Sequence, residues 1–225
     1  MSLTPVEFSS PNFNDRPKDI VPNILVIHYT GMKSLDQALQ RLTSSDSQVS
    51  AHYLISQQGE VFKLVSEEKR AWHAGISYWR GKTDINSYSI GIELENPGHE
   101  FGYTKFPKGQ MAVLTELCIE IINKYSISPE NIVGHSDIAP RRKKDPGELF
   151  DWRSLAKNGV GLWPEPALDM VTAEPFEKSL NNFGYEVVDL RSTITAFQRH
   201  YLPDTVSGIS DSNTQKTLAT LMALV

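Results

Sequence analysis

The sequence of 225 residues is long enough for one large domain, or for a medium domain followed by a small one. Its 40% hydrophobic and 22% charged residues are typical of a globular protein and exclude a chain that is disordered, collagen-like or coiled coil throughout. A net charge of −5 argues against nucleic acid as a partner, and no apolar run approaches the roughly 20 residues of a membrane-spanning segment.

The first third of the chain predicts an extended segment, a buried strand, a helix and a hairpin. Residues 1–22 are rich in Pro, Ser, Asn and Asp and predict an extended lead-in. Ile24–Ile27 is a continuous apolar run, typical of a buried strand. Apolar residues at helical spacing predict a helix over 34–43. Strand-like runs at 51–56 and 61–65 flank a glycine turn and predict a hairpin.

The middle of the chain predicts two more strands around a long helix. Residues 88–95 and 131–135 read as strands, and residues 109–125 carry the longest amphipathic pattern. The single cysteine, Cys118, lies in the apolar stripe of that helix, so we expect a buried thiol and no internal disulfide. Strands that alternate with helices predict an α/β fold with a mixed central β-sheet flanked by helices.

The last part of the chain predicts a small three-helix bundle. A Gly- and Pro-rich stretch at 159–166 marks a change in composition, and three short helical patterns follow it. We therefore expect a catalytic domain over 1–164, a linker over 165–173 and a helical domain over 174–225. Because residues 1–164 contain their own apolar strands and helices, we expect them to fold without the helical domain.

Two of the six histidines stand where predicted strands end. His28 follows the first apolar strand and His135 closes the last one, and site residues of α/β sheets gather at such ends. Asp145 lies ten residues after His135 in the same loop. Two imidazoles and a carboxylate suit a Zn²⁺ ion with one open position for water. On spacing alone, a pair of structural histidines remains the alternative.

Five short motifs in this order closely resemble the zinc-dependent N-acetylmuramoyl-L-alanine amidases of the AmpD/AmiD type. They lie at 26–30, 49–55, 71–75, 89–95 and 134–147, and the resemblance extends over about residues 11–164. A further set of motifs in the tail resembles a three-helix peptidoglycan-binding domain. These lie at 182–185, 196–201, 206–208 and 211–214. The resemblance implies an amidase fold and a tail that holds peptidoglycan.

The resemblance also implies which residues carry the chemistry. It places one Zn²⁺ ion on His28, His135 and Asp145, the catalytic carboxylate on Glu93 and the catalytic lysine on Lys143. A carboxylate can take a proton from water and deliver it to the leaving amine, and a lysine can offset charge on an oxyanion. The neighbouring Glu95 and Lys144 are expected to have a supporting role and a solvated side chain, respectively.

Several other residues are expected to line the substrate groove or to support the structure around the site. Trp72 and His73 are candidates for the substrate groove. We expect His52 to be a structural histidine on a strand, and His200 to lie at the surface. Asp137 is a candidate for orienting the loop or the ligands next to it.

The function implied is hydrolysis of the amide bond between (anhydro-)N-acetylmuramic acid and L-alanine in peptidoglycan stem peptides. The expected partners are peptidoglycan or muropeptides, and the expected state is a monomer. A non-catalytic recognition module is one alternative, but such a protein would lack at least one of the zinc ligands or Glu93. The binding tail favours the bacterial envelope. The first residues carry no signal-peptide pattern, which keeps open a cytosolic recycling amidase restricted to anhydro-muropeptides.

Overall fold

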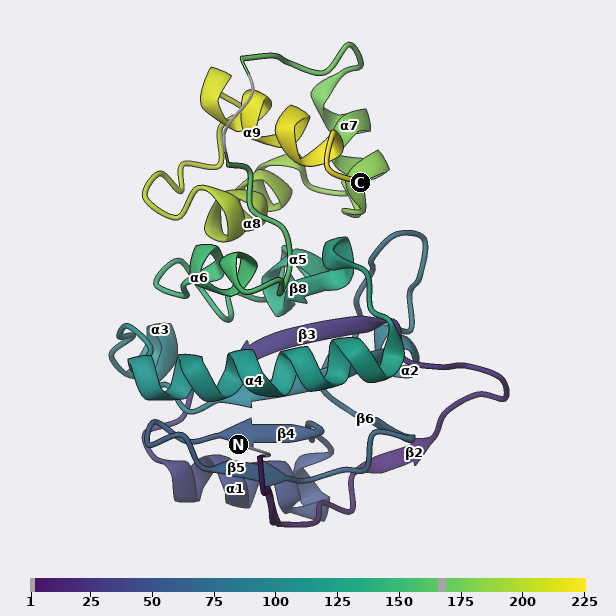
Figure 1. Ribbon diagram of the computed structural model, residues 1–225, viewed down its shortest axis with the longest axis vertical. Helices are drawn as coiled ribbons and strands as arrows, with labels where there is room; N and C mark the ends of the chain where they lie inside the picture. The colour runs from purple at the N-terminus through teal and green to yellow at the C-terminus, as the bar shows by residue number, and fades with distance from the viewer. Residues whose placement is uncertain (1–2, 166–168) are drawn as a thin grey trace.

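A mixed β-sheet with helices on its sides forms the centre of the computed structural model, which describes residues 3–165 and 169–225 (Figure 1). The strand order is β1-β5-β4-β7-β3-β8, with β5 antiparallel to β4 and the other neighbours parallel. The six strands are β1 (Val6–Glu7), β3 (Ile24–Tyr29), β4 (Tyr53–Ile55), β5 (Val61–Lys63), β7 (Ser89–Leu94) and β8 (Ile132–Gly134). A small antiparallel pair joins β2 (Phe13–Asp15) and β6 (Lys69–Ala71). This arrangement confirms the expected α/β fold.

The longer helices begin and end close to the residues that the sequence predicts. In the first two thirds of the chain they are α1 (Leu35–Thr43) and α4 (Lys108–Tyr125). The C-terminal bundle consists of α7 (Phe176–Phe183), α8 (Leu190–Tyr201) and α9 (Ser212–Met222). Four short helices were not anticipated: α2 (Ile85–Tyr88), α3 (Gly98–Phe101), α5 (His135–Ile138) and α6 (Trp152–Lys157). Within the described residues, no helix has both the length and the apolar character that crossing a bilayer requires.

Strand β3 separates two hydrophobic cores because its side chains alternate between the faces of the sheet. Leu25 and Ile27 belong to the core that α4 covers. Ile24 and Val26 point to the other face and belong to a core that includes residues of α7, α8 and α9. Cys118 is fully buried in the α4 core, as expected. Coverage on both faces explains why this strand is apolar without interruption.

The three C-terminal helices pack directly on the body of the protein, at the β8 side of the sheet (Figure 1). The ring of Tyr185 meets Trp79 edge to face at 5.0 Å between centroids, and Arg80 donates to the carbonyl oxygen of Phe183 at 2.7 Å. This shared core argues against the expectation that residues 1–164 fold independently. The boundaries proposed for the two domains stay a prediction, and residues 1–2 of the lead-in and 166–168 of the linker lie outside the described residues.

The register of the parallel strands brings the predicted site residues to one edge of the sheet. In the β3–β7 ladder, His28 stands opposite Glu93, so the two side chains emerge on the same face. In the β3–β8 ladder, Ile27 stands opposite Gly134, which places His135 at the level of His28. The carboxyl ends of three neighbouring strands therefore converge on one place.

The shared core predicts that the sheet and the C-terminal helices unfold together. Phe197 is fully buried between Tyr185 and Tyr201, so Phe197→Ala should lower the free energy of unfolding of the whole chain by about 3–5 kcal/mol. Urea denaturation followed by tryptophan fluorescence and by circular dichroism should give one coincident transition. The exposed Val188→Ala is the control and should leave the midpoint unchanged. Two separate transitions, with only one shifted by Phe197→Ala, would show independent domains.

Candidate active site

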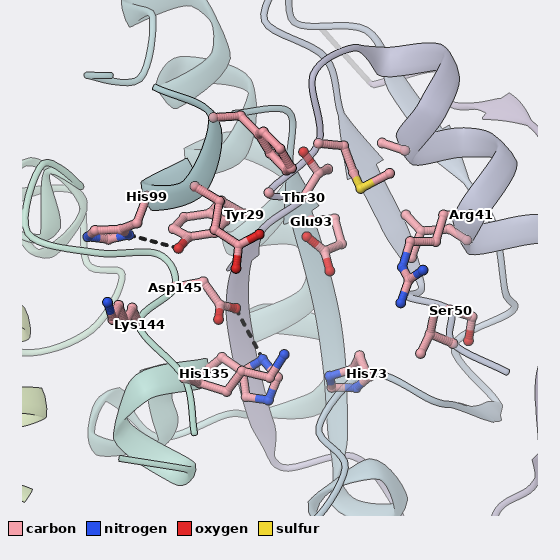
Figure 2. Close-up of a pocket in the computed structure, with 18 of the residues that line it drawn as sticks. Tyr29, Thr30, Arg41, Ser50, His73, Glu93, His99, His135, Lys144 and Asp145 are labelled. Atoms are coloured by element: carbon pink, nitrogen blue, oxygen red, sulfur yellow. Dashed lines mark hydrogen bonds and ion pairs between the residues drawn. The ribbon is translucent and has the colours of Figure 1, made fainter. Parts of the chain in front are cut away.

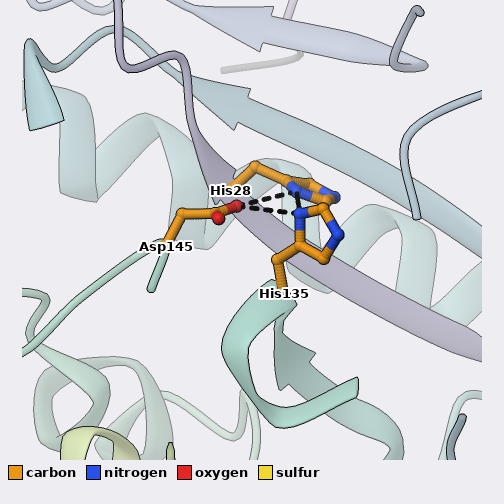
Figure 3. Close-up of side chains that lie close together, drawn as sticks. All are labelled: His28, His135 and Asp145. Atoms are coloured by element: carbon orange, nitrogen blue, oxygen red, sulfur yellow. Dashed lines mark hydrogen bonds and ion pairs between the residues drawn. The ribbon is translucent and has the colours of Figure 1, made fainter. Parts of the chain in front are cut away.

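Three buried side chains bring one electron-rich atom each to a common point (Figure 3). Nδ1 of His28 lies 2.9 Å from Nδ1 of His135 and 3.0 Å from Oδ2 of Asp145. Nδ1 of His135 lies 3.1 Å from the same carboxylate oxygen. These separations are slightly less than the edge of about 3.3 Å in a tetrahedron with zinc bonds of about 2.0–2.1 Å. The atoms therefore have the spacing of ligands around one metal ion.

Backbone contacts hold the segments that carry these three residues. His28 is the second-last residue of the buried strand β3, and His135 begins α5 directly after β8, rather than ending the strand as expected. The loop that follows α5 folds back, and the amide of Ser136 donates to the carbonyl oxygen of Asp145 at 2.9 Å. Residues 107 positions apart in the sequence thus meet because two parallel strands end side by side.

A chain of hydrogen bonds assigns the tautomer of His28. The hydroxyl of Ser89 donates to the carbonyl oxygen of Ile85 at 2.7 Å, so Ser89 Oγ accepts from Nε2 of His73 at 3.1 Å. Nδ1 of His73 then carries a lone pair and accepts from Nε2 of His28 at 3.0 Å. The proton of His28 therefore lies on Nε2, and Nδ1 presents its lone pair to the site.

The second ring nitrogen of His135 also has a hydrogen-bond partner, in this case a backbone carbonyl group. Its Nε2 donates to the carbonyl oxygen of Ala74 at 3.1 Å, so the neutral imidazole has its Nδ1 lone pair facing His28 and Asp145. Burial, followed by the nearby His135, lowers the pKa of His28 to about 4, so its imidazole is neutral near pH 7. Two imidazole lone pairs and a carboxylate oxygen that face one another repel unless a cation lies among them. The donor set therefore fits a divalent metal ion.

The two carboxylates of the site have opposite electrostatic surroundings. Burial alone would raise the pKa of Asp145, but interaction with His135 and His28 in their protonated forms outweighs burial and holds this pKa well below its usual range. Burial and the charge of Asp145 raise the pKa of Glu93 to about 8, and the charge of Lys143 opposes this shift. Oε2 of Glu93 is buried and has no hydrogen-bond partner among the described residues. Glu93 is thus free to exchange a proton with a molecule bound beside it.

A cleft of about 600 Å³ opens over these groups, and Figure 2 shows the side chains around it. Glu93, Lys143, Trp72 and His73 all line this cleft. The ring nitrogens of His73 are engaged by His28 and Ser89, so this side chain supports the site rather than offering a free donor to a substrate.

Other residues with sequence-based interpretations have clear positions. His52 is fully buried, and its Nδ1 accepts from the amide of Gly91 at 3.0 Å, in keeping with a structural histidine. Glu95 accepts from the amide of Gln57 at 2.9 Å and is not part of the cleft wall. Lys144 is exposed at the rim of the cleft.

Sequence reasoning missed part of the cleft wall and misplaced one histidine. Eight polar or aromatic residues of the wall were not anticipated: Tyr29, Thr30, Arg41, Ser50, His99, Glu100, Phe101 and Arg142. Tyr29 and Thr30 carried a signal because they directly follow His28 at the strand end, and Ser50 and Arg142 lie within the motifs at 49–55 and 134–147. The prediction that His200 lies at the surface is wrong, since this residue is only 2% exposed.

Comparison with known proteins gives consistent matches. Residues 17–148 match the family model described as N-acetylmuramoyl-L-alanine amidase. The amidase AmiD of Escherichia coli is 40% identical, over 88% of this chain and 82% of that protein. The 1,6-anhydro-N-acetylmuramyl-L-alanine amidase AmpD of Escherichia coli is 37% identical, over 64% of this chain and 85% of that protein.

Solved structures of similar proteins extend the match to the tail. The complex of AmiD from E. coli with anhydro-N-acetylmuramic acid-L-Ala-D-γ-Glu-L-Lys superposes with a TM-score of 0.81 at 36% identity, and covers 95% of this chain and 98% of that chain. AmpDh3 from Pseudomonas aeruginosa in complex with anhydromuramic pentapeptide gives a TM-score of 0.84 at 31% identity, over 90% of this chain and 92% of that chain.

The position of His73 depends on a glycine, which gives a test of the hydrogen-bond chain. A Cβ atom at Gly91 would lie 2.5 Å from Cγ of His73, so Gly91→Ala must displace the ring from His28. We expect a loss of about 1–3 kcal/mol in the free energy of unfolding, the usual cost of overpacking. Gly109→Ala in α4 meets open space and should be neutral or slightly stabilising. Equal denaturation midpoints for both variants would contradict this role of Gly91.

Proposed function

Because this chain belongs to the N-acetylmuramoyl-L-alanine amidase family, we propose that it works with one zinc ion held by His28, His135 and Asp145. It is an enzyme, and it hydrolyses the amide bond between N-acetylmuramic acid and L-alanine of peptidoglycan stem peptides. The observation that supports the metal most directly is the convergence of three lone pairs in a buried place. Their hydrogen-bond partners leave no proton to bridge the two Nδ1 atoms.

The residues of this chain have distinct roles in the proposed reaction. Bound zinc supplies Lewis acidity, which lowers the pKa of water and polarises a carbonyl oxygen. Glu93 takes the proton of the attacking water and delivers it to the leaving amine. Its raised pKa suits both steps, since the carboxyl group then holds and releases a proton near neutral pH. Lys143 offsets the negative charge that develops on the carbonyl oxygen of the substrate.

The substrates we propose are muropeptides, including those with an anhydro-muramic acid end. Two relatives with TM-scores above 0.8 were solved with anhydro-muropeptides, and this chain has a cleft over the carboxyl edge of its own sheet. The C-terminal helices are proposed to bind peptidoglycan, which would raise the local concentration of substrate at the cleft.

The cellular place of action follows from the preferred substrate. A peptidoglycan-binding tail favours the cell envelope, in the periplasm, whereas a cytosolic recycling enzyme would act only on soluble anhydro-muropeptides. Mass spectrometry of products from purified sacculi and from soluble anhydro-muropeptides separates these two roles. Release of stem peptides from sacculi supports the envelope role, and activity on the soluble substrate alone supports recycling.

Removal of the metal tests the cofactor directly. Treatment with a chelator should abolish hydrolysis, and stoichiometric Zn²⁺ should restore it, because the three side chains leave one coordination position open. Metal content measured by mass spectrometry should fall and rise with the activity. Full activity in a sample verified to be free of metal would overturn the zinc proposal.

Substitution of Glu93 tests the proton transfer. Glu93→Ala should retain zinc and lose about 10²–10⁴-fold in kcat, the usual contribution of a general acid or base. Glu95→Ala is the matched control, because it removes a carboxylate two residues away that is not part of the cleft wall, and it should retain most of the turnover. If Glu93→Ala turns over like the wild type, Glu93 is not the base and Glu95 becomes the candidate.

A further inference from the structure

A buried carboxylate next to the proposed metal site is held largely by the C-terminal helices. Asp137 lies on α5, two residues after His135, and is 1% exposed. Oδ1 accepts from the hydroxyl of Tyr185 at 2.7 Å. Oδ2 accepts from Nδ1 of His200 at 2.8 Å and from the amide of Gly134 at 2.7 Å. Two of these three donors therefore come from the segment that follows residue 173.

The ring of His200 is fixed in place as well as buried. It stacks between Trp152 and Tyr201, at centroid distances of 3.8 Å and 3.9 Å. Nε2 of His200 is buried and has no hydrogen-bond partner among the described residues. The polar contact of this side chain is thus its bond to Asp137, which spans 63 positions of sequence.

Asp137 in turn fixes the short turn that carries one metal ligand and touches another. Its bond to the amide of Gly134 closes the turn around His135. The Cα of Gly134 faces Pro146 so closely that an added Cβ would lie 2.7 Å from the proline ring. The next amide, of Ser136, holds the carbonyl oxygen of Asp145. A movement of this turn would therefore change the positions of both His135 and Asp145.

Helix α8, which carries His200, makes a second contact near the cleft through Arg199. Nε of Arg199 lies 3.6 Å from Oε2 of Glu148, and Glu148 lies 3.3 Å from Nε2 of His99. Nδ1 of His99 lies 2.8 Å from the hydroxyl of Tyr29, the residue that follows His28. Adjacent residues of α8 thus contact Asp137 on α5 and Glu148 in the segment that follows α5, and Glu148 connects to His99 at the cleft.

We infer that helix α8 is part of the support of the metal site, and that His200 is a positioning residue for the zinc ligands through Asp137. This inference rests on the proposed zinc site. It means that the C-terminal helices contribute to zinc affinity and to turnover of small soluble muropeptides, and not only to retention on polymeric peptidoglycan. Removal of the donor of His200 leaves the charge of Asp137 with one fewer partner in a buried place.

The test compares His200→Phe, which keeps the stacked ring and removes the donor, with the wild-type full-length chain. Competition with a chromophoric chelator should show zinc affinity reduced by about 10-fold, as for other groups that orient metal ligands. With zinc at saturating concentration, kcat on a soluble anhydro-muropeptide should fall more than KM changes. His200→Asn retains a side-chain N–H near the position of Nδ1 and should recover much of the zinc affinity.

The matched control separates positioning from general stability. Leu221→Ala in α9 truncates a fully buried side chain of the same core and lies away from Asp137. It should lower Tm at least as much as His200→Phe and leave zinc affinity unchanged. If both variants lose Tm and both keep wild-type zinc affinity, the helices only cover the sheet and the inference is wrong. If the wild type itself binds no zinc, the proposed function fails instead.

Discussion

The structure depends on keeping three electron-rich atoms about 3 Å apart in a buried place, an arrangement that is repulsive without a cation. If one of these atoms were on a flexible loop, it could move away from the other two. The rest of the fold must therefore hold all three in place. The two histidines lie at the carboxyl ends of parallel strands in fixed register, and the second ring nitrogen of each is held by a hydrogen bond. Asp145 is held through its own backbone. The three side chains are therefore preorganised for the proposed metal ion, and the free energy of folding maintains their positions.

Two carboxylates lie close together at this site, and their surroundings shift their pKa values in opposite directions. The pKa of Asp145 is held well below its usual range, so this side chain is ionised, which suits a metal ligand. Glu93 stands one strand away, opposite His28, where burial and the charge of Asp145 favour its protonated form. Pairs of acids pushed in opposite directions by their environment are a recurring way to obtain a ligand or nucleophile and a proton carrier side by side.

Two hydrophobic cores on opposite faces of β3 explain how the tail became part of this arrangement. The α4 core is built from residues before 164, whereas the other core combines β3 with three helices after residue 175. Since that second face of the sheet is apolar, it needs a cover, and in this chain the cover also donates to Asp137. A modular view of the tail, natural from its composition, therefore misses its contact with α5.

Local features were accessible from the sequence alone. A continuous apolar run predicted β3, strand-like runs predicted β7 and β8, and helical periodicity predicted α4 and the three C-terminal helices. Short motifs identified the proposed ligands together with Glu93. The strands β1, β2 and β6 were missed because two or three residues carry too little pattern, and pairing with a partner strand decides their conformation.

The long-range contacts needed the tertiary structure. The sequence could not show that His73 orients His28, that His200 is buried against Asp137, or that Tyr29 and His99 share one wall of the cleft. Each of these contacts joins residues 45 to 70 positions apart. Sequence determines which side chains can bind a metal or carry a proton, since that is a property of residue type. Strand register and packing decide which of them meet, because only the folded chain brings distant residues within hydrogen-bond distance.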